Sequence, residues 1–172
     1  MISKSLQAQL DKHIPKREQQ AFVELAVKTQ LHKHMAMNAE SIEVYVDGGS
    51  RGNPGPAGGG FAVFRGGENV LQGSEFYGEK TNNQAEYLAL RTALREVYSR
   101  FPDLKIHCFM DSQLVVEQMS GNYKVKNANI RPLFDEVQRI VGQFKVFTIR
   151  HIERAQNSLA DQLANEAMDR KK

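Results

Sequence analysis

The stretch VYVDGGSRGNPG, residues 44–55, decides the fold of this chain. It begins as a strand pattern, because apolar Val44 and Val46 alternate with more polar neighbours. Asp47 stands where the apolar run stops, and glycines follow it at positions 48, 49, 52 and 55. Glycine accepts positive φ and lets a ligand approach the backbone closely. The stretch alone leaves two interpretations open: a glycine-rich hairpin turn, or a site for a metal ion or a phosphate.

The composition predicts one globular domain with a small appendage. The chain has 172 residues, of which 41% are hydrophobic, and this is enough apolar material for one core. A net charge of +3 and a pI near 9.0 permit a polyanionic partner without requiring one. No apolar run of about 18 residues occurs, so we expect no membrane span. The start lacks an apolar signal core, and the single Cys108 is expected to be a buried thiol, so the expected location is cytoplasmic.

Residues 1–40 differ in composition from residues 41–172, which predicts a helical N-terminal extension before the main domain. Leu6, Leu10 and Ile14 recur at helical spacing, and a second helix is expected at about residues 16–35, with residues 35–40 as a linker. Two short helices bury too little to be stable alone, so they should dock on the main domain or on a partner. With six Lys or Arg against four acids, the extension could add affinity for nucleic acid or mediate self-association.

The main domain is predicted to be an α/β fold with a mixed sheet covered by helices. Glycine, proline and polar clusters separate its apolar segments, and Asp111 with Ser112 makes a natural N-cap. The strand at 104–110 is a continuous apolar run, so we expect burial on both of its faces. The expected strands are residues 42–47, 57–64, 69–77, 104–110 and 145–151. The expected helices are residues 82–100, 113–119 and 130–141, and a final helix that opens at Asn157 or Ser158.

Four acids are expected at one rim of the core. Asp47 and Asp111 each follow an apolar strand, and parallel neighbouring strands would bring both to the same sheet edge, where ligands bind in open α/β sheets. Glu86 and Asp161 lie near helix starts among apolar neighbours, so each should point partly inward. Unpaired buried carboxylates cost several kcal/mol, and divalent cations relieve that cost. Oxygen ligands suit Mg²⁺ or Mn²⁺ rather than zinc.

Four segments in order resemble type 1 ribonuclease H: DGGSRGNPGPAGGGF from residue 47, TNNQAEYLAL from 81, MDSQLVVEQMSG from 110 and HIERAQNSLADQLANEA from 151. The resemblance covers about residues 42–170. It implies the ribonuclease H-like fold, a five-stranded mixed sheet whose first three strands are antiparallel. It also implies that Asp47, Glu86, Asp111 and Asp161 bind two Mg²⁺ ions, with Mn²⁺ as a possible substitute. The implied reaction is endonucleolytic hydrolysis of the RNA strand of RNA–DNA hybrids, which leaves 5′-phosphates.

The resemblance further implies a set of substrate contacts. Asn82, Asn83 and Gln113 would read the hybrid in its minor groove, since amides can pair with a 2′-OH as donor or acceptor. Thr81 could hold a phosphate or cap the helix at residue 82. The remaining candidates are Gly48, Ser50 and Asn53, for which a turn stays open, Asn157, for which a helix cap stays open, and Gln84 in the helix expected at residues 82–100.

Two residues compete for a role beside the metals. His151 lies ten residues before Asp161, a spacing at which a familiar histidine of the family assists proton transfer or product release. Its surroundings, however, predict a strand that continues past His151. Arg154 lies seven residues before Asp161, as in a subgroup of the family, and would bind phosphate or transition-state charge because arginine is no general base. We rank Arg154 above His151.

The loop at residues 121–127 contains only two lysines, so the chain resembles the subgroup that lacks the basic protrusion. Because phosphate contacts dominate nucleic-acid affinity, the domain should bind its hybrid weakly. Two alternatives to the endoribonuclease remain: a non-catalytic or weakly catalytic domain that binds hybrid or duplex RNA, and a nuclease of this fold that acts on duplex RNA or DNA.

Overall fold

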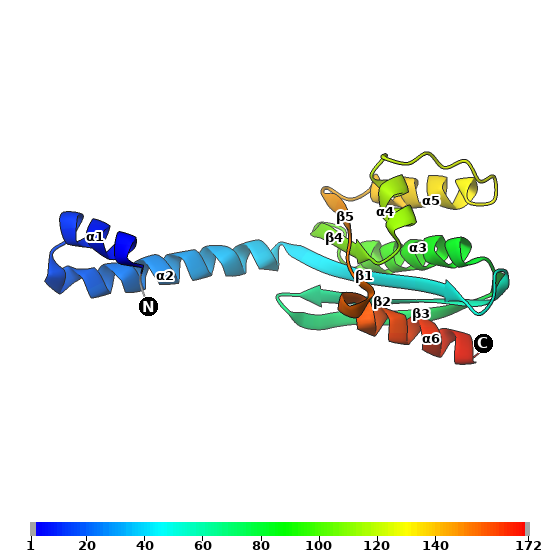
Figure 1. Cartoon of the computed structure of the whole chain (residues 1–172), viewed down its shortest axis with the longest axis horizontal. Coiled ribbons are helices and arrows are strands. Elements are labelled where there is room, and N and C mark those ends of the chain that lie inside the picture. Colours follow the sequence, from blue (N-terminus) through cyan, green and yellow to red (C-terminus); the bar gives the residue numbers. More distant parts are fainter. Residues whose placement is uncertain (1–2, 171–172) are drawn as a thin grey trace. The chain divides into compact units, whose positions relative to one another are not determined.

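The structure, a computed structural model, describes residues 3–170, apart from the side chains of residues 31–39. The chain divides into two compact units, residues 1–38 and residues 39–172. The larger unit contains a five-stranded sheet in the order β3-β2-β1-β4-β5, which Figure 1 shows. Its strands are β1 (Ser41–Ser50), β2 (Gly55–Arg65), β3 (Glu68–Lys80), β4 (Lys105–Met110) and β5 (Phe147–His151).

The sheet is mixed, as expected. β1 pairs with β2 and β2 with β3 in antiparallel fashion, whereas β1–β4 and β4–β5 are parallel pairs. Val46 of β1 lies opposite Met110 of β4 in the last pair of their ladder, so Asp47 and Asp111 follow at the same level of the sheet. The predicted five-stranded architecture is confirmed.

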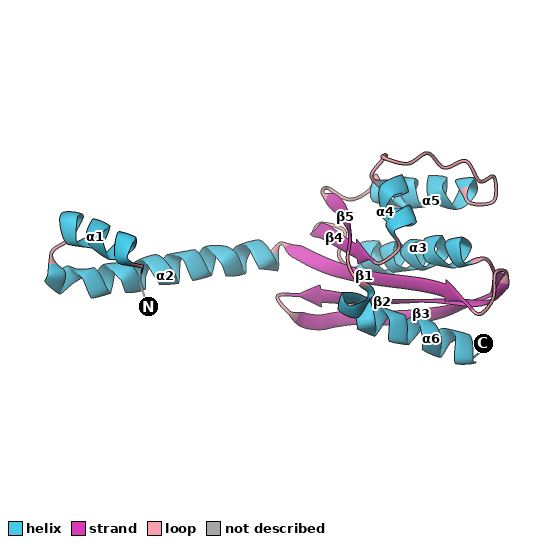
Figure 2. Ribbon diagram, viewed as in Figure 1, coloured by secondary structure: helices cyan, strands magenta, loops and turns pink. Residues whose placement is uncertain are grey.

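Helices cover both faces of this sheet (Figures 1 and 2). α3 (Asn82–Arg100), α4 (Gln113–Met119) and α5 (Arg131–Val141) lie on one face, and α6 (Ser158–Arg170) lies on the other. Between the sheet and α3, Val44, Val46, Leu90 and Leu94 are fully buried in one apolar cluster. Each such side chain contributes about 1.5–3 kcal/mol when it leaves water.

Glycines in β2 allow α6 to pack close to the sheet. A Cβ atom on Gly60 would lie 2.5 Å from the carbonyl oxygen of Ala160, and one on Gly58 would lie 3.0 Å from that of Ala164. Side chains at these positions would therefore push the helix outward. Since Asp161 follows Ala160 directly, this close packing fixes the height of that acid above the sheet.

Several element boundaries differ from the expectation. β1 continues through Gly48 and Gly49 to Ser50, because these residues pair with β2, and of the four glycines of the stretch only Gly52 has positive φ. On β4, Ile106, Cys108 and Met110 are buried, but the other face is only half-buried, so the prediction of two buried faces was wrong. The structural reason is that α6 packs mainly against β1, β2 and β3.

The last helix also begins differently. β5 ends at His151 instead of continuing past it, and a short 3-10 helix, η1 (Arg154–Asn157), precedes α6. α6 then opens at Ser158, which is one of the two predicted starts.

The smaller unit is a pair of helices, α1 (Lys4–His13) and α2 (Lys16–Ala39). Ser3 caps α1 by accepting a hydrogen bond from the Leu6 N–H at 3.2 Å. Leu10 is buried, whereas Phe22 is 51% exposed. The predicted linker at residues 35–40 was wrong, because α2 continues through Ala39 and β1 starts at Ser41. None of the helices in the described residues is long and apolar enough to cross a membrane.

Candidate active site

Asp47 and Asp111 emerge from neighbouring parallel strands. Each follows directly on the last residue pair of the β1–β4 ladder, Val46 with Met110. Gly48 lets β1 pass close to the start of α3, since a Cβ atom there would lie 2.4 Å from the carbonyl oxygen of Ala85. The glycine after Asp47 is therefore needed for helix packing, and this contact draws β1 toward the helix that carries Glu86.

Glu86 is positioned by the first turn of α3. The Asn82 side chain donates from Nδ2 to Glu86 Oε1 at 3.1 Å, while its Oδ1 accepts from the Ser50 N–H at 3.2 Å. This one amide joins the end of β1 to Glu86. The other carboxylate oxygen, Glu86 Oε2, is buried without a hydrogen-bond partner among the described residues.

Asp161 lies in the first turn of α6 and forms an ion pair with Arg154 of η1. The Asp161 side chain is 26% exposed and the Arg154 side chain 74%, so the arginine covers the carboxylate from the solvent side. Asn165, one turn further along α6, donates to Asp161 Oδ2 at 3.2 Å. The guanidinium therefore neutralises the charge of the Asp161 carboxylate.

The four acids line one cavity of about 270 Å³. Burial, followed by the charges of Asp111 and Asp161, raises the pKa of Asp47 to about 7. Burial also raises the pKa of Glu86 to about 7, although a hydrogen bond with Ser112 opposes the shift. The other residues that line the cavity are Gly48, Gly49, Ser50, Arg51, Asn82, Ser112, Arg154, Asn165 and Met168.

The cavity has the donor set that divalent cations need. Its acids supply only oxygen ligands, the set that Mg²⁺ and Mn²⁺ prefer. Raised pKa values and the unpartnered Glu86 Oε2 both indicate negative charge that lacks a counter-ion. In the described part of the chain no three acid, histidine or cysteine side chains already form a metal-ligand group. Asn82, Arg154 and Asn157 instead hold Glu86, Asp161 and Asp111.

Several predicted substrate contacts serve the local structure. Thr81 and Gln84 form a capping box at the start of α3, and Asn53 Oδ1 accepts from the Asn82 N–H at 3.2 Å. The Ser50 hydroxyl donates to the Gly52 carbonyl. Half-buried Asn83 does not line the cavity. Exposed Gln113, the first residue of α4, also lies outside its lining.

Asn157 is not a helix cap. It is 1% exposed, its Nδ2 donates to Val46 O at 2.9 Å and to Asp111 Oδ1 at 3.0 Å, and its Oδ1 has no hydrogen-bond partner in the described residues. A cap would have to accept a backbone N–H through that oxygen.

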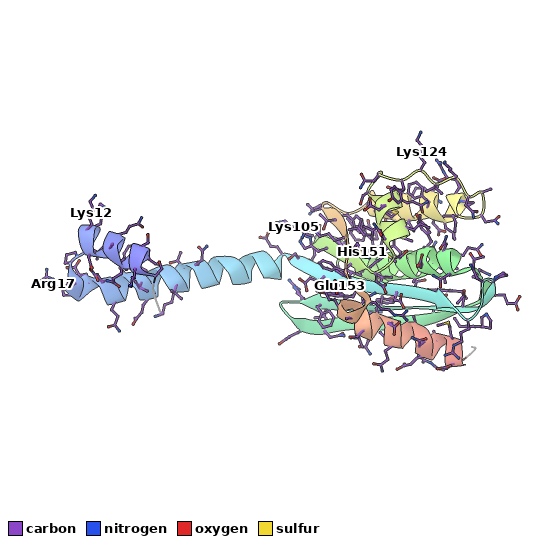
Figure 3. All side chains as sticks on the ribbon, viewed as in Figure 1. Lys12, Arg17, Lys105, Lys124, His151 and Glu153 are labelled. Atoms are coloured by element: carbon purple, nitrogen blue, oxygen red, sulfur yellow. The ribbon has the colours of Figure 1, made fainter. Side chains whose placement is uncertain are left out.

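Arg154 and His151 occupy different environments. Arg154 lines the cavity and contacts Asp161, whereas His151 is exposed at the end of β5 and does not line the cavity. Figure 3 labels His151, the last residue of β5, and Glu153, the residue directly before η1. The placement favours Arg154 as the residue beside the acids.

Sequence reasoning did not place Ser112 and Asn165 at the site. Ser112 was interpreted only as a helix cap, and it does accept from the Val115 N–H at 3.4 Å while it also contacts Glu86. Asn165 lies four residues after Asp161, so the helical repeat could have identified it.

Known proteins are similar to this chain in fold and in sequence. A family model described as "Reverse transcriptase-like" matches residues 45–167. The RNase H1 from the halophilic archaeon Halobacterium salinarum is 40% identical, with a TM-score of 0.73 over 76% of this chain and 98% of that one. LC11-RNase H1, solved in complex with an RNA/DNA hybrid, is 39% identical, with a TM-score of 0.72 over 76% and 98%. The Bifunctional protein Rv2228c of Mycobacterium tuberculosis is 40% identical over 130 residues, or 74% of this chain.

The sheet order and the carboxylate cavity define an RNase H-like domain. This chain belongs to the type 1 ribonuclease H family, which confirms the resemblance found in the sequence motifs. It spans about a third (35%) of the length of Rv2228c and of the other mycobacterial relatives that it matches. Residues 120–130, between α4 and α5, contain turns and no helix, so the chain lacks a helical basic protrusion there.

Proposed function

We propose that this chain is an endoribonuclease that hydrolyses the RNA strand of RNA–DNA hybrids, with two Mg²⁺ ions as cofactors and 5′-phosphate products. The observation that carries the proposal is the convergence of Asp47, Glu86, Asp111 and Asp161 on one cavity. The 39% identity to an RNase H1 solved with an RNA/DNA hybrid supports the choice of substrate.

The cavity residues would have different roles: the acids would bind the cations, and Arg154 would bind phosphate. When bound, a pair of divalent cations supplies an activated water and stabilisation of the leaving oxygen. Asp47 and Glu86 must lose their protons before they can act as ligands, which their pKa values near 7 allow at mildly basic pH. Arg154 stays protonated and can neutralise phosphate charge, but it cannot accept a proton. Asn83 and Gln113, outside the cavity, remain candidates for contacts to the minor groove.

The test compares labelled RNA–DNA hybrid, duplex RNA and duplex DNA, each with Mg²⁺ or Mn²⁺. We expect cleavage of the RNA strand of the hybrid alone, and 5′-phosphate ends on the products. Cleavage of hybrid that survives Asp47→Asn would refute the site. Binding of hybrid without cleavage would support the alternative, a weakly catalytic binding domain.

We also propose a cytoplasmic location. Cys108 is buried, and burial raises the pKa of its thiol to about 12, so the group would stay reduced and unreactive there. Cell fractionation with an antibody to the chain tests this, and recovery in a secreted or membrane fraction would contradict it.

A further inference from the structure

Gln118 and Asn157 are the two buried residues with amide side chains in the described part of the chain. Gln118 accepts a hydrogen bond from the Tyr87 hydroxyl at 2.8 Å and thereby joins α4 to α3. Asn157 is the more deeply buried, at 1% exposure against 7%. A buried amide that lacks part of its hydrogen bonding is unfavourable for stability, so its place calls for a physical explanation.

The Asn157 amide joins the strand that contains Asp47 to Asp111, the residue that follows β4. An amide nitrogen carries two hydrogens, and both are used: one for the carbonyl oxygen of Val46, the other for Asp111 Oδ1. Val46 directly precedes Asp47, so the first bond fixes the backbone that carries Asp47. The second fixes the orientation of the Asp111 carboxylate.

The same residue anchors the segment that supplies the fourth acid. Asn157 is the last residue of η1, which begins with Arg154, and Asp161 follows it by one helical turn. Its two bonds therefore set the height of Arg154 and Asp161 relative to the strand ends. Both hydrogens of the Asn157 amide are bound to protein oxygens, whereas its Oδ1 has no partner among the described residues.

We propose that Asn157 is a positioning residue that sets the geometry of the acids for cation binding, and that it does not contact substrate. The inference rests on the proposed function for its kinetic consequences, but its effect on cation affinity can be measured without any nucleic acid. It replaces the expectation that Asn157 holds the substrate, because both donors of the side chain already bind protein oxygens.

The experiment compares Asn157→Ala and Asn157→Ser with the matched control Gln118→Met in the full chain. Calorimetric titration with Mn²⁺ in the absence of nucleic acid gives the cation affinity. We expect Asn157→Ala to weaken it about tenfold or more, as partners of metal ligands do when removed, and Asn157→Ser, which keeps one donor, to recover part of the loss. Gln118→Met should lower Tm and leave the Mn²⁺ affinity unchanged within about twofold, because Gln118 does not line the cavity of the four acids.

Kinetics on the hybrid separate positioning from substrate contact. Asn157→Ala should lower kcat and raise the Mg²⁺ requirement, with KM for the hybrid within about twofold of the unchanged chain. A raised KM with unchanged Mn²⁺ affinity would overturn the proposal, as would equal effects of Asn157→Ala and Gln118→Met on Mn²⁺ binding, or no Mn²⁺ binding by the unchanged chain. If that chain binds Mn²⁺ but cleaves no hybrid, the proposed function fails while the Mn²⁺ comparison still decides the role of Asn157. Should Asn157→Ala not fold, the same criteria apply to Asn157→Ser.

Discussion

The two units of this chain organise their side chains in opposite ways. Residues 39–172 bury a continuous apolar cluster between the sheet and its helices, and neighbouring side chains hold Glu86, Asp111 and Asp161 at one cavity. The described part of residues 1–38 buries Leu10 alone among its hydrophobic residues and exposes Leu6, Phe22, Leu25 and Val27 by 47%, 51%, 65% and 60%.

The contrast in buried apolar surface predicts which of the two units can fold and act by itself. A pair of helices with so small a core is marginal in water, so α1 and α2 must gain stability from contacts beyond their own pairing. The larger unit has its core and its acids within its own residues. We therefore expect cleavage to depend on the larger unit alone, and the smaller unit to act through association.

The largest expected effect is that of Asp47→Asn. Loss of one ligand charge should lower hybrid cleavage by more than about 100-fold, since even partners of metal ligands are worth about 10–100-fold. Folding should survive, because the change also removes repulsion from Asp111 and Asp161. Single-turnover kinetics measure the loss of cleavage, and circular dichroism measures whether the variant folds. An active Asp47→Asn variant would show that the four acids are not the catalytic centre.

A smaller effect separates Arg154 from His151 within the larger unit. Arg154→Ala should lower kcat about tenfold, because the residue contacts Asp161 at the cavity. His151→Ala should stay within about twofold, because this exposed residue does not line the cavity. Steady-state rates at saturating Mg²⁺ decide between them, and the reverse order of effects would restore the histidine as the assisting residue.

Local sequence signals predicted most of the larger unit. The helices at residues 82–100 and 113–119 have the predicted bounds, because Thr81 and Ser112 are caps that can be recognised in the sequence. The linker at residues 35–40 was wrong for a related reason. No glycine or proline interrupts residues 35–39, and methionine and alanine favour a helix, so nothing in the sequence stops α2 before Ala39.

The partners of the acids lay beyond such local signals. Strand ends and helix starts identified Asp47, Glu86, Asp111 and Asp161 as candidates, but the bond from Asn157 to Asp111 joins residues 46 positions apart. It exists only because η1 packs against β1 at Val46, beside the residue that follows β4. Gly48 likewise appeared to be a turn residue, and its contact with Ala85 depends on the packing of α3 against β1.

A third prediction concerns stability and pH in the absence of metal. Asp47 and Glu86 have pKa values near 7 in the folded chain, and about 4 is ordinary for an unfolded one. Between these values the folded state binds more protons, so the free energy of unfolding falls as pH rises from about 4 to 7. At about 1.4 kcal/mol for each pKa unit, we expect these two groups together to account for several kcal/mol of that loss.

Urea unfolding at pH 5 and pH 8 measures this loss in the metal-free protein. In Asp47→Asn the loss between the two pH values should be smaller, and Mg²⁺ should restore stability to the unchanged protein at pH 8. Phe22→Ala, in the N-terminal helices, is the control, and its loss of stability between the two pH values should equal that of the unchanged protein. A loss reduced as much as in Asp47→Asn would mean that the effect does not arise from the acid cluster. Equal losses in Asp47→Asn and the unchanged protein would mean that the acid cluster does not hold protons.

The smallest effect on catalysis is expected when residues 1–38 are deleted. We propose that this unit mediates self-association, because Phe22 and Leu25 expose apolar surface that a second pair of helices could cover. Deletion should leave kcat on the hybrid within about twofold, while sedimentation velocity changes from a dimer to a monomer. In the full chain, Phe22→Glu with Leu25→Glu should have the same effect on sedimentation, and exposed Lys28→Ala provides the matched control. A full chain that is monomeric at micromolar concentration would contradict the proposed self-association. A large fall in kcat on deletion would show that cleavage depends on both units.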